Sequence, residues 1–475
     1  MHMPRAPSPI NAEHLNRIRG WYDAKPDKFG WASMGYRTML AHYYNLLIPP
    51  EASVLEVGCG SGELLVRLRA RRRVGIDISE KQIAAAQLRA TDCVFHVQVA
   101  ESLQLDERFD CILISDTLNL AADVQQVLEG LHAVSHAGTR LIVNYPSALW
   151  RPAFAVARAL GLKSRSPQSN WLASSDIRGL MELADWSPLW LQPRILCPVR
   201  ALGIGSFINR WIAPLFSCFC LTVFCVARSA RTRGTGPLTV SIVIPARNEA
   251  GNIEAAVKRT PEMGAGTELI FVEGHSKDNT WEEIERVAKV YSSRRIKTLR
   301  QPGRGKGDAV RAGFAAAEGD LFMILDADLT VPPEEMPKFY EAVVSGRTEF
   351  ANGSRLVYPM GKAAMRFLNI CANKTFGILF TWILGQPLKD TLCGTKVLRR
   401  PDYERIVANR AFFGDFDPFG DFDLLFGAAH LNMKIVDVPV RYRDRTYGST
   451  NINRWRHGWL LLRMVFFAAR KLKFV

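Results

Sequence analysis

The sequence lacks the cysteine patterns that mark metal centres and disulfide frameworks. Its nine cysteines include no Cys-x-x-Cys pair and no cluster with histidine, and the closest two are Cys218 and Cys220. This spacing excludes a conventional zinc site. No secretory signal peptide is recognisable either, so we expect reduced thiols in the cytoplasm, buried mainly as small apolar side chains.

A clear membrane-spanning run is also missing. Residues 211–227 are uncharged, but this stretch is 17 residues long and contains Pro214, whereas a spanning helix needs roughly 20. We interpret it as a loop leading into a buried strand, with a spanning helix as the less favoured alternative. There is no internal repeat, and no motif accompanies the net charge of +15 that would indicate nucleic acid as a partner.

Acidic residues are scarce at the end of the chain. Residues 441–475 contain nine lysines and arginines and one acid, Asp444, mixed with leucines and aromatics. This mixture favours a helix lying in an anionic membrane surface, which would make the protein peripheral. The alternative is a helix packed on its own domain with a charged outer face.

Two aspartates follow a short apolar strand in the second half of the chain. The predicted strand 321–324 leads directly to Asp326 and Asp328. In extended chain, side chains at positions i and i+2 point the same way, so both carboxylates can address one cation. Hard oxygen ligands suit Mg²⁺ or Mn²⁺, and such a cation would neutralise a departing diphosphate.

The surrounding pattern alternates strands with helices, which predicts a parallel α/β sheet with ligands at its carboxyl edge. Polar segments follow the predicted strands 240–245 and 269–272, and a glycine-rich turn precedes the helix 308–318. This ordered set resembles an inverting family 2 glycosyltransferase of GT-A fold. The resemblance implies a metal and diphosphate site at Asp326 and Asp328, and donor-nucleotide contacts at Glu249, Glu273, Asp278 and Lys306.

The donor's base stays open between uracil and guanine. Where the family usually carries Asp-Asp-Gly-Ser after the second strand, this chain has residues 273–276 as Glu-Gly-His-Ser.

Three later segments, 352–355, 389–396 and 440–450, concern the acceptor. They resemble motifs of dolichol-phosphate mannosyltransferases and bacterial polyprenyl-phosphate glycosyltransferases. The resemblance implies that Arg355 and Arg445 receive a lipid phosphate and that Asp390 is the acceptor-side catalytic aspartate. If the acceptor were instead a glycan hydroxyl, Asp390 would be the natural general base.

The first half of the chain carries a separate nucleotide signature. A predicted strand at 53–57 contains Glu56 and turns through Gly58, Gly60 and Gly62 into a predicted helix at 63–69. Glycines let the backbone approach a ligand closely. A second predicted strand, 73–76, ends in Asp77, placed to hold ribose hydroxyls.

Residues 30–228 resemble a class I S-adenosylmethionine-dependent methyltransferase. By that resemblance Glu56, the three glycines, Asp77 and Glu101 bind the cofactor, although Val99 stands where many relatives have aspartate. A dinucleotide-binding Rossmann unit is a less favoured alternative, because the glycine spacing differs. A non-catalytic scaffolding domain with this fold is the stronger alternative.

Together these features predict an α/β protein of two domains. A Rossmann-like methyltransferase domain spans residues 1–228, a linker spans 229–238, and a GT-A nucleotide-diphospho-sugar transferase domain spans 239–475. The predicted protein is a bifunctional cell-envelope enzyme, cytoplasmic and peripheral on the inner face of the membrane. It would use S-adenosylmethionine, Mg²⁺ or Mn²⁺, and a UDP- or GDP-linked sugar, with polyprenyl phosphate as acceptor. The methyl acceptor, the sugar and the oligomeric state stay open.

Overall fold

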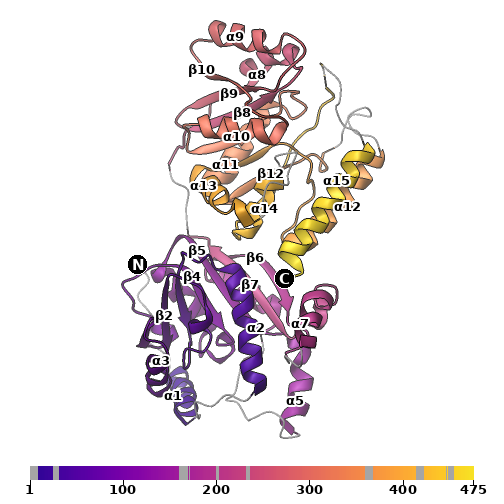
Figure 1. Ribbon diagram of the computed structural model, residues 1–475. Coiled ribbons are helices and arrows are strands. Elements are labelled where there is room, and N and C mark those ends of the chain that lie inside the picture. The colour runs from indigo at the N-terminus through magenta and orange to yellow at the C-terminus, as the bar shows by residue number, and fades with distance from the viewer. Residues whose placement is uncertain are drawn as a thin grey trace. The chain divides into compact units, whose positions relative to one another are not determined.

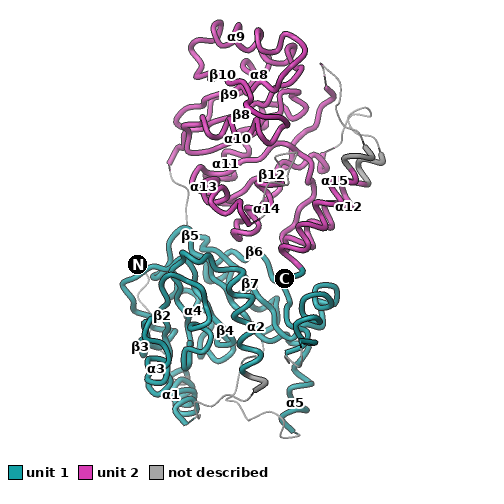
Figure 2. Tube along the Cα trace, in the orientation of Figure 1, with its two compact units in different colours: residues 1–232, 474 teal, residues 233–473, 475 magenta. Residues whose placement is uncertain are grey.

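The computed structural model describes residues 9–24, 31–159, 170, 172–198, 203–231, 236–358, 367–412, 422–445, 447 and 454–475. The chain divides into two compact units (Figure 2), unit 1 with residues 1–232 and unit 2 with residues 233–473. The boundary falls inside the segment 229–238 that the sequence predicts as a linker. Each unit holds one seven-stranded mixed sheet, so the predicted α/β class is confirmed.

The sheet of unit 1 has the strand order β3-β2-β1-β4-β5-β7-β6 (Figure 1). The first five strands are parallel, and β7 runs antiparallel to both β5 and β6. Since β2 and β4 flank β1 on opposite sides, the connections after β1 and β4 diverge and leave a crevice at their carboxyl ends. The strands are β1 Ser53–Val57, β2 Arg72–Asp77, β3 Val94–Val97, β4 Phe109–Ser115, β5 Ser135–Pro146, β6 Trp186–Arg194 and β7 Thr222–Ser229.

Helices cover this sheet. Apolar side chains of α4 and α6 pack against β1, β4 and β5 in one buried cluster. The helices are α1 Pro9–Ala24, α2 Trp31–Leu47, α3 Glu80–Arg89, α4 Val124–Gly130, α5 Arg151–Ala159, α6 Ser174–Leu183 and α7 Ile204–Phe207.

The strands predicted in unit 1 are confirmed, but the helix predicted at 63–69 is wrong. Only a single 3₁₀ turn, η1 Leu65–Arg67, forms there, and Leu68 returns to extended backbone. The physical reason is the short connection. Gly62 still has a left-handed φ of 74°, while the amide of Arg71 already donates to the carbonyl of Ala52 beside β1.

Residues 211–227 form the expected loop and buried strand, with short helical turns before the strand. A π-helical turn, η7 Ile208–Ile212, and a 3₁₀ turn, η8 Ser217–Phe219, precede β7. Among the described helices of the chain, none is both long and apolar enough to cross a membrane.

The sheet of unit 2 has the order β10-β9-β8-β11-β13-β12-β14. Strands β10, β9, β8 and β11 are parallel, and β13 runs antiparallel to β11 and β12. Here β9 and β11 flank β8 on opposite sides, so the crevice lies between β8 and β11. The strands are β8 Val240–Ala246, β9 Thr267–Glu273, β10 Arg295–Arg300, β11 Leu321–Ile324, β12 Phe350–Ser354, β13 Lys396–Arg399 and β14 Ile435–Pro439.

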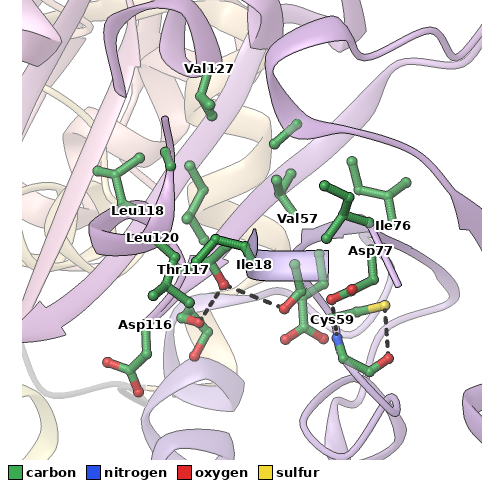
Figure 3. Close-up of a pocket in the computed structure, with 18 of the residues that line it drawn as sticks. Ile18, Val57, Cys59, Ile76, Asp77, Asp116, Thr117, Leu118, Leu120 and Val127 are labelled. Atoms are coloured by element: carbon green, nitrogen blue, oxygen red, sulfur yellow. Dashed lines mark hydrogen bonds between the residues drawn. The ribbon is translucent and has the colours of Figure 1, made fainter. Parts of the chain in front are cut away.

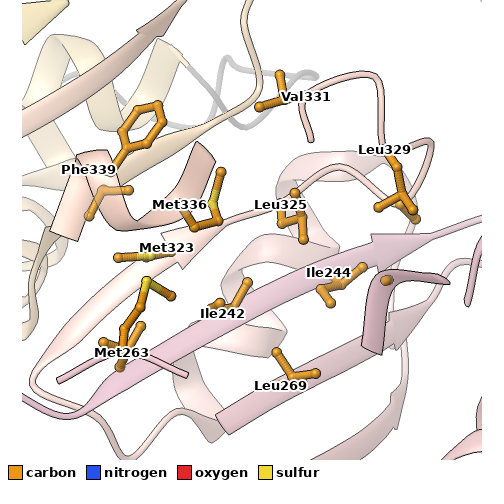
Figure 4. Close-up of a cluster of buried hydrophobic side chains, with 14 of the residues drawn as sticks. Ile242, Ile244, Met263, Leu269, Met323, Leu325, Leu329, Val331, Met336 and Phe339 are labelled. Carbon is orange, nitrogen blue, oxygen red and sulfur yellow. The ribbon is translucent and has the colours of Figure 1, made fainter. Parts of the chain in front are cut away.

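The core of unit 2 lies between this sheet and its helices. Figure 4 shows Ile242, Leu269 and Met323 of the sheet packed with Met336 and Phe339 of α11. This packing fixes where β8 and β11 end. The helices are α8 Ile253–Arg259, α9 Thr280–Val290, α10 Lys306–Ala316, α11 Met336–Val344, α12 Phe367–Leu384, α13 Arg400–Ala408, α14 Phe422–His430 and α15 Arg454–Ala468.

Candidate active sites

In unit 2 a cavity of about 280 Å³ opens at the carboxyl ends of β8 and β11. Ala246 and Arg247 reach it from the end of β8, and Asp326 and Asp328 from the end of β11. The remaining charged and polar lining side chains come from the segments that follow β8, β10 and β14: Glu249, Gln301, Lys306 and Arg445. The cavity therefore lies in the crevice of the sheet, and it gathers four of the predicted donor-side residues with one predicted acceptor-side arginine.

Asp326 is paired with Lys306. The ammonium Nζ of Lys306 lies 2.6 Å from Asp326 Oδ1, because Lys306 is the first residue of α10 and points back toward the sheet. Burial alone would raise the pKa of Asp326, but Lys306, together with the charges of Lys396 and Arg355, holds it below its ordinary value. Asp326 is thus a carboxylate at neutral pH.

Gly394 makes this pairing sterically feasible. A Cβ at this position would lie 2.1 Å from Asp326 Oδ2 and 2.2 Å from Lys306 Nζ. Such distances are far inside van der Waals contact, so no other residue fits without moving the pair. Neither Gly394 nor Lys396, whose buried Nζ donates to the carbonyl of Cys393, was among the predicted site residues. Both lie in the segment 389–396, from which the sequence predicted only Asp390 as a site residue.

Asp328 is held by Arg445 and Thr330. Arg445 Nη2 lies 2.7 Å from Asp328 Oδ2, and its Nη1 lies 3.2 Å from Glu249 Oε1. The amide and hydroxyl of Thr330 donate to Asp328 Oδ1 at 3.1 and 2.8 Å. Burial raises the pKa of Glu249, and Arg445 opposes that shift. One arginine thus ties the β8 side of the crevice to the β11 side.

Glu273 and Asp278 make local contacts instead of lining this cavity. Glu273 Oε1 accepts from the amide of Ser276 at 2.5 Å. Asp278 Oδ1 accepts from the amide and hydroxyl of Thr280 at the start of α9. Both side chains shape the two loops that follow β9 and β8, since the amide of Ala250 also approaches Asp278 at 3.5 Å.

Arg355, the residue directly after β12, forms a buried ion pair with Asp390. Arg355 Nε and Nη2 donate to the two oxygens of Asp390 at 2.7 and 2.9 Å. The amides of Arg355 and Leu392 and the side chain of Asn373 donate to the same carboxylate. Arg355 and these donors lower the pKa of Asp390 to about 2 against the effect of burial. With five donors, this fully buried carboxylate is already saturated with hydrogen bonds.

The donor set at Asp326 and Asp328 fits a divalent cation shared with a substrate. Among the described residues, no group of three or more histidine, cysteine, aspartate or glutamate side chains gathers as a complete metal site. Magnesium-type sites commonly use one or two carboxylates and complete their coordination with phosphate oxygens and water. Two adjacent aspartates next to Lys306 and Arg445 match that arrangement.

In unit 1 a cavity of about 310 Å³ lies over the ends of β1, β2 and β4 (Figure 3). The turn after β1 carries Gly58, Gly60 and Gly62, all with left-handed φ of 53–76°. A Cβ on Gly58 would lie 2.3 Å from the side chain of Thr117. Glycine is therefore required at Gly58 both by conformation and by the close approach of the loop after β4.

Asp77 closes the glycine turn. Its Oδ2 accepts from the amide of Gly60 at 2.8 Å and its Oδ1 from the amide of Ser79 at 2.9 Å, and Asp77 lines the cavity (Figure 3). Glu101 also lines it, and its Oε1 accepts from the amide of Ala122. The structure thus brings five of the six residues predicted to bind the cofactor into the lining of this cavity. The sixth, Gly62, lies behind the lining, against Phe95.

Glu56 is the least satisfied polar group in this cavity. It is 2% exposed, and its Oε2 has no hydrogen-bond partner among the described residues. Burial raises the pKa of Glu56 to about 8, and the nearby charge of Arg37 opposes the shift. A buried carboxyl that lines a cavity and has one oxygen without a partner fits the ammonium group of an amino-acid ligand.

Sequence reasoning missed the contribution of the first two helices to this cavity. Leu15, Ile18 and Tyr22 of α1 and Tyr36 and Arg37 of α2 line it. Residues 1–30 carry no motif, and from the sequence Pro4, Pro7 and Pro9 predict only a loose tail. The apolar positions Leu15, Ile18 and Tyr22, spaced three and four apart, were the one signal that could have indicated a helix face.

Comparisons with known proteins agree with this division. Residues 48–178 match a methyltransferase-domain family, and residues 241–407 match glycosyl transferase family 2. A dolichol-phosphate mannosyltransferase from Pyrococcus furiosus is 29% identical over 221 residues, which cover 45% of this chain and 59% of the relative. The chain spans less than two thirds of the length of the curated relatives that it matches first.

Two solved structures are each similar to about half of the chain. A SAM-dependent methyltransferase from Thermotoga maritima has 18% identity and a TM-score of 0.35, and the match covers 46% of this chain and 99% of that one. Glucosyl-3-phosphoglycerate synthase from Mycobacterium tuberculosis, solved with Mn²⁺ and UDP, has 20% identity and a TM-score of 0.35 over 50% of this chain and 80% of that one. The chain is a methyltransferase domain followed by a family 2 glycosyltransferase domain.

Proposed function

We propose that unit 2 transfers a sugar, with inversion, from a UDP- or GDP-linked donor to the phosphate of a polyprenyl phosphate. The observation that carries this proposal is the juxtaposition of Asp326, Asp328, Lys306 and Arg445 in one crevice. Two carboxylates and two cations within ion-pair distance suit a diphosphate with its counter-cation. The similarity to a dolichol-phosphate mannosyltransferase supports a lipid phosphate as acceptor.

The residues of the crevice would act by exchanging partners. Lys306 and Arg445 now neutralise Asp326 and Asp328. A bound diphosphate offers both cations a stronger partner, and the two carboxylates then become available as ligands. A Mg²⁺ or Mn²⁺ held there would stabilise the negative charge that develops on the leaving nucleoside diphosphate. The crevice thus favours departure of the leaving group on one side of the sugar while the acceptor attacks from the other.

The acceptor side favours an anionic nucleophile over a hydroxyl. A phosphate oxygen already carries charge and needs to be positioned, whereas a hydroxyl needs a general base. Asp390 is buried, its pKa is about 2, and it already accepts five hydrogen bonds. It is therefore a poor base, and we assign it the role of holding the guanidinium of Arg355 in place.

The exposed face of α15 supports peripheral attachment to a membrane. Leu461, Met464 and Ala468 are buried on one side of this helix, while Trp459, Leu462 and Phe466 are 48–70% exposed on the other. Arg463 and Arg470 flank this apolar stripe and are exposed. A helix of this kind suits the anionic inner face of a cell membrane, which would place the enzyme on the cytoplasmic side and near a polyprenyl acceptor.

For unit 1 the proposal is binding of S-adenosylmethionine and transfer of its methyl group. The glycine turn and Asp77 offer contacts for the ribose of the cofactor, and the unpartnered Oε2 of Glu56 offers one for its ammonium. When bound, the cofactor supplies an electrophilic methyl group. Calorimetry with the full chain should show binding of the cofactor or its demethylated product, weakened by Asp77→Ala. Absence of binding by the folded chain would favour the non-catalytic scaffolding alternative.

The glycosyltransferase proposal is tested by incubating the protein with a panel of UDP- and GDP-sugars, Mn²⁺ and a short polyprenyl phosphate. We expect a sugar-phosphate-lipid product that disappears with excess chelator. A product formed only on soluble glycan hydroxyls would favour the alternative acceptor. Full activity in excess chelator would contradict the metal assignment.

A further inference from the structure

Two connections of unit 1 leave the sheet at the same edge as the cofactor cavity. β5 ends at Pro146, which pairs with Thr222, the first residue of β7. Thr222 in turn pairs with Arg194, the last residue of β6. Two sets of described residues therefore emerge at the carboxyl edge of the parallel strands: 147–159 after β5, and 195–198 with 203–221 between β6 and β7. In open α/β sheets, ligands bind at this edge.

These connections carry most of the exposed apolar side chains of unit 1. Twelve large apolar side chains are exposed among the described residues of this unit, and eight of them lie in residues 147–159 and 203–221. We call these two segments the edge patch. Its exposed apolar residues are Leu149, Val156, Ile204, Phe207, Trp211, Leu215, Phe216 and Phe219. Clusters of this kind mark interaction surfaces.

Helix α5 within the patch has no buried residue at all. Its sequence, Arg-Pro-Ala-Phe-Ala-Val-Ala-Arg-Ala, is largely apolar, and in Figure 1 it extends away from the sheet of unit 1. A nine-residue helix gains little stability from propensity alone and normally depends on burying an apolar face. Packing on an external surface would bury such a face.

Hydrogen bonds join the two segments to each other and to the cavity. Trp150 Nε1 donates to the carbonyl of Phe219 at 3.0 Å, and the amide of Ser147 donates to the carbonyl of Leu221 at 2.7 Å. One residue further on, the hydroxyl of Thr222 lies 2.9 Å from that of Tyr36, which lines the cavity. The patch thus continues directly into the wall of the candidate methyl-transfer site.

The positive charge of the edge patch favours an anionic partner. Arg151, Arg158 and Arg210 are the charged residues of segments 147–159 and 203–221, which contain no aspartate or glutamate. Exposed aromatic and aliphatic side chains with arginines and no acids match the chemistry of an anionic lipid surface.

We propose that the edge patch lies on an anionic lipid surface and that the methyl acceptor of unit 1 is a lipid-linked molecule presented at that surface. The second part rests on the proposed methyltransferase function. Because the patch borders the cavity, a lipid-anchored acceptor group could enter from the membrane side without leaving the bilayer interface.

Cys218 lies in the patch and is exposed, so it can report on this contact. An environment-sensitive fluorophore would be attached to Cys218 of the full chain carrying Cys197→Ser and Cys371→Ser. The matched control carries Cys218→Ser and Leu88→Cys, because Leu88 is 89% exposed on α3 and outside the patch. On vesicles of phosphatidylcholine with phosphatidylglycerol, we expect the emission at Cys218 to rise and shift to shorter wavelength, with no change at the control position.

A variant distinguishes contact of the edge patch with the vesicle from attachment of the protein through α15. Leu215→Ser with Phe216→Ser should abolish the change at Cys218 while the protein still sediments with vesicles. An unchanged Cys218 signal from wild-type protein that does sediment would overturn the proposal. A signal that depends on protein concentration without vesicles would assign the patch to a second copy of the chain and would equally overturn it.

The acceptor class needs its own readout. The full chain would be incubated with radiolabelled S-adenosylmethionine and bacterial membranes, followed by extraction into organic solvent. Label in the organic phase supports a lipid-linked acceptor, and label confined to the aqueous phase or absent from both contradicts it. If Cys218 responds to vesicles but calorimetry detects no cofactor, the surface proposal stands and the methyltransferase function fails.

Discussion

The ammonium of Lys306 lies 2.6 Å from a carboxylate oxygen of Asp326, beside a glycine with no room for a side chain. This pairing keeps Asp326 ionised in a partly buried position and leaves it available for exchange with a cation. The donor site is therefore charge-balanced before substrate arrives, which avoids the cost of burying an uncompensated carboxylate.

Replacing Gly394 with alanine should disable the donor site without unfolding unit 2. The added Cβ would collide with both Asp326 and Lys306, so the pair must separate. We expect sugar transfer to fall by roughly a hundredfold or more, since a displacement of about 1 Å can have that effect. Gly236→Ala is the control, because a Cβ there meets no atom within 4 Å. Equal activity of the two variants would contradict the crowding argument.

Arg445→Ala should lower transfer to polyprenyl phosphate more than it lowers donor hydrolysis. The guanidinium bridges Glu249 and Asp328. In our proposal transfer needs it for both the diphosphate and the acceptor phosphate, whereas hydrolysis needs it for the diphosphate alone. The two rates would be measured on the same preparation. Arg443→Ala is the matched control, since Arg443 is exposed two residues away. If Arg443→Ala shows the same defect, the defect comes from the loss of positive charge in this segment and not from a specific contact of Arg445.

Asp390→Asn should destabilise unit 2 at neutral pH. Removing one partner of a buried ion pair leaves Arg355 uncompensated and costs about 3–5 kcal/mol. Because the pKa of Asp390 in the folded state, about 2, is below its ordinary value of 3.8, its stabilising contribution is present above about pH 3.8 and is lost as the pH falls toward 2. Chemical denaturation at several pH values would measure both effects.

The comparison variant for this experiment is Asp444→Asn, which changes an exposed carboxylate. It should leave the denaturation midpoint within the small range typical of surface substitutions. A midpoint for Asp390→Asn as high as that of the comparison variant would show that the buried pair is not stabilising.

Binding of S-adenosylmethionine should release a proton through Glu56. With a pKa of about 8 in the free protein, the carboxyl is mostly protonated at pH 7, and a ligand ammonium beside it favours the carboxylate. Calorimetry at pH 7 in two buffers with different ionisation enthalpies should therefore give different apparent binding enthalpies. Glu56→Gln should remove that difference, and a buffer-independent enthalpy for the wild type would contradict the assignment.

Glu56 also predicts a pH dependence of stability. A folded-state pKa raised from 4.5 to about 8 means that stability is fully present below about pH 4.5 and declines as the pH rises toward 8. Thermal unfolding should show a smaller loss over this range for Glu56→Gln than for the wild type. A parallel pH profile for the two proteins would mean that Glu56 is ionised in the folded state.

Much of the architecture could be predicted because the residues at the strand ends are recognisable in the sequence. Asp326 and Asp328 follow an apolar run, and the turn at Gly58 needs left-handed φ, so both crevices could be located from the sequence. The partners of these residues could not. Arg445 lies 117 residues from Asp328 along the chain, and no periodicity indicates that the two meet.

On the acceptor side, too, the partners of a predicted residue could not be read from the sequence. Asp390 could be recognised by its motif, but its role depends on how many donors surround it. The amides of Arg355 and Leu392 and the side chain of Asn373 on α12 saturate the carboxylate. A sequence pattern identifies the residue type, whereas the three-dimensional packing decides whether the group is a base or an anchor.

The most direct test of the account is calorimetric titration of the full chain with UDP and with GDP, in Mn²⁺ and then in excess chelator. If Asp326 and Asp328 form the donor-diphosphate site, one of the two nucleotides should bind in Mn²⁺, at least about tenfold more weakly with chelator, a loss of about 1.4 kcal/mol. Asp328→Asn should show the weak binding under both conditions. Binding of neither nucleotide, or tight binding that survives both the chelator and Asp328→Asn, would contradict the assignment of this crevice.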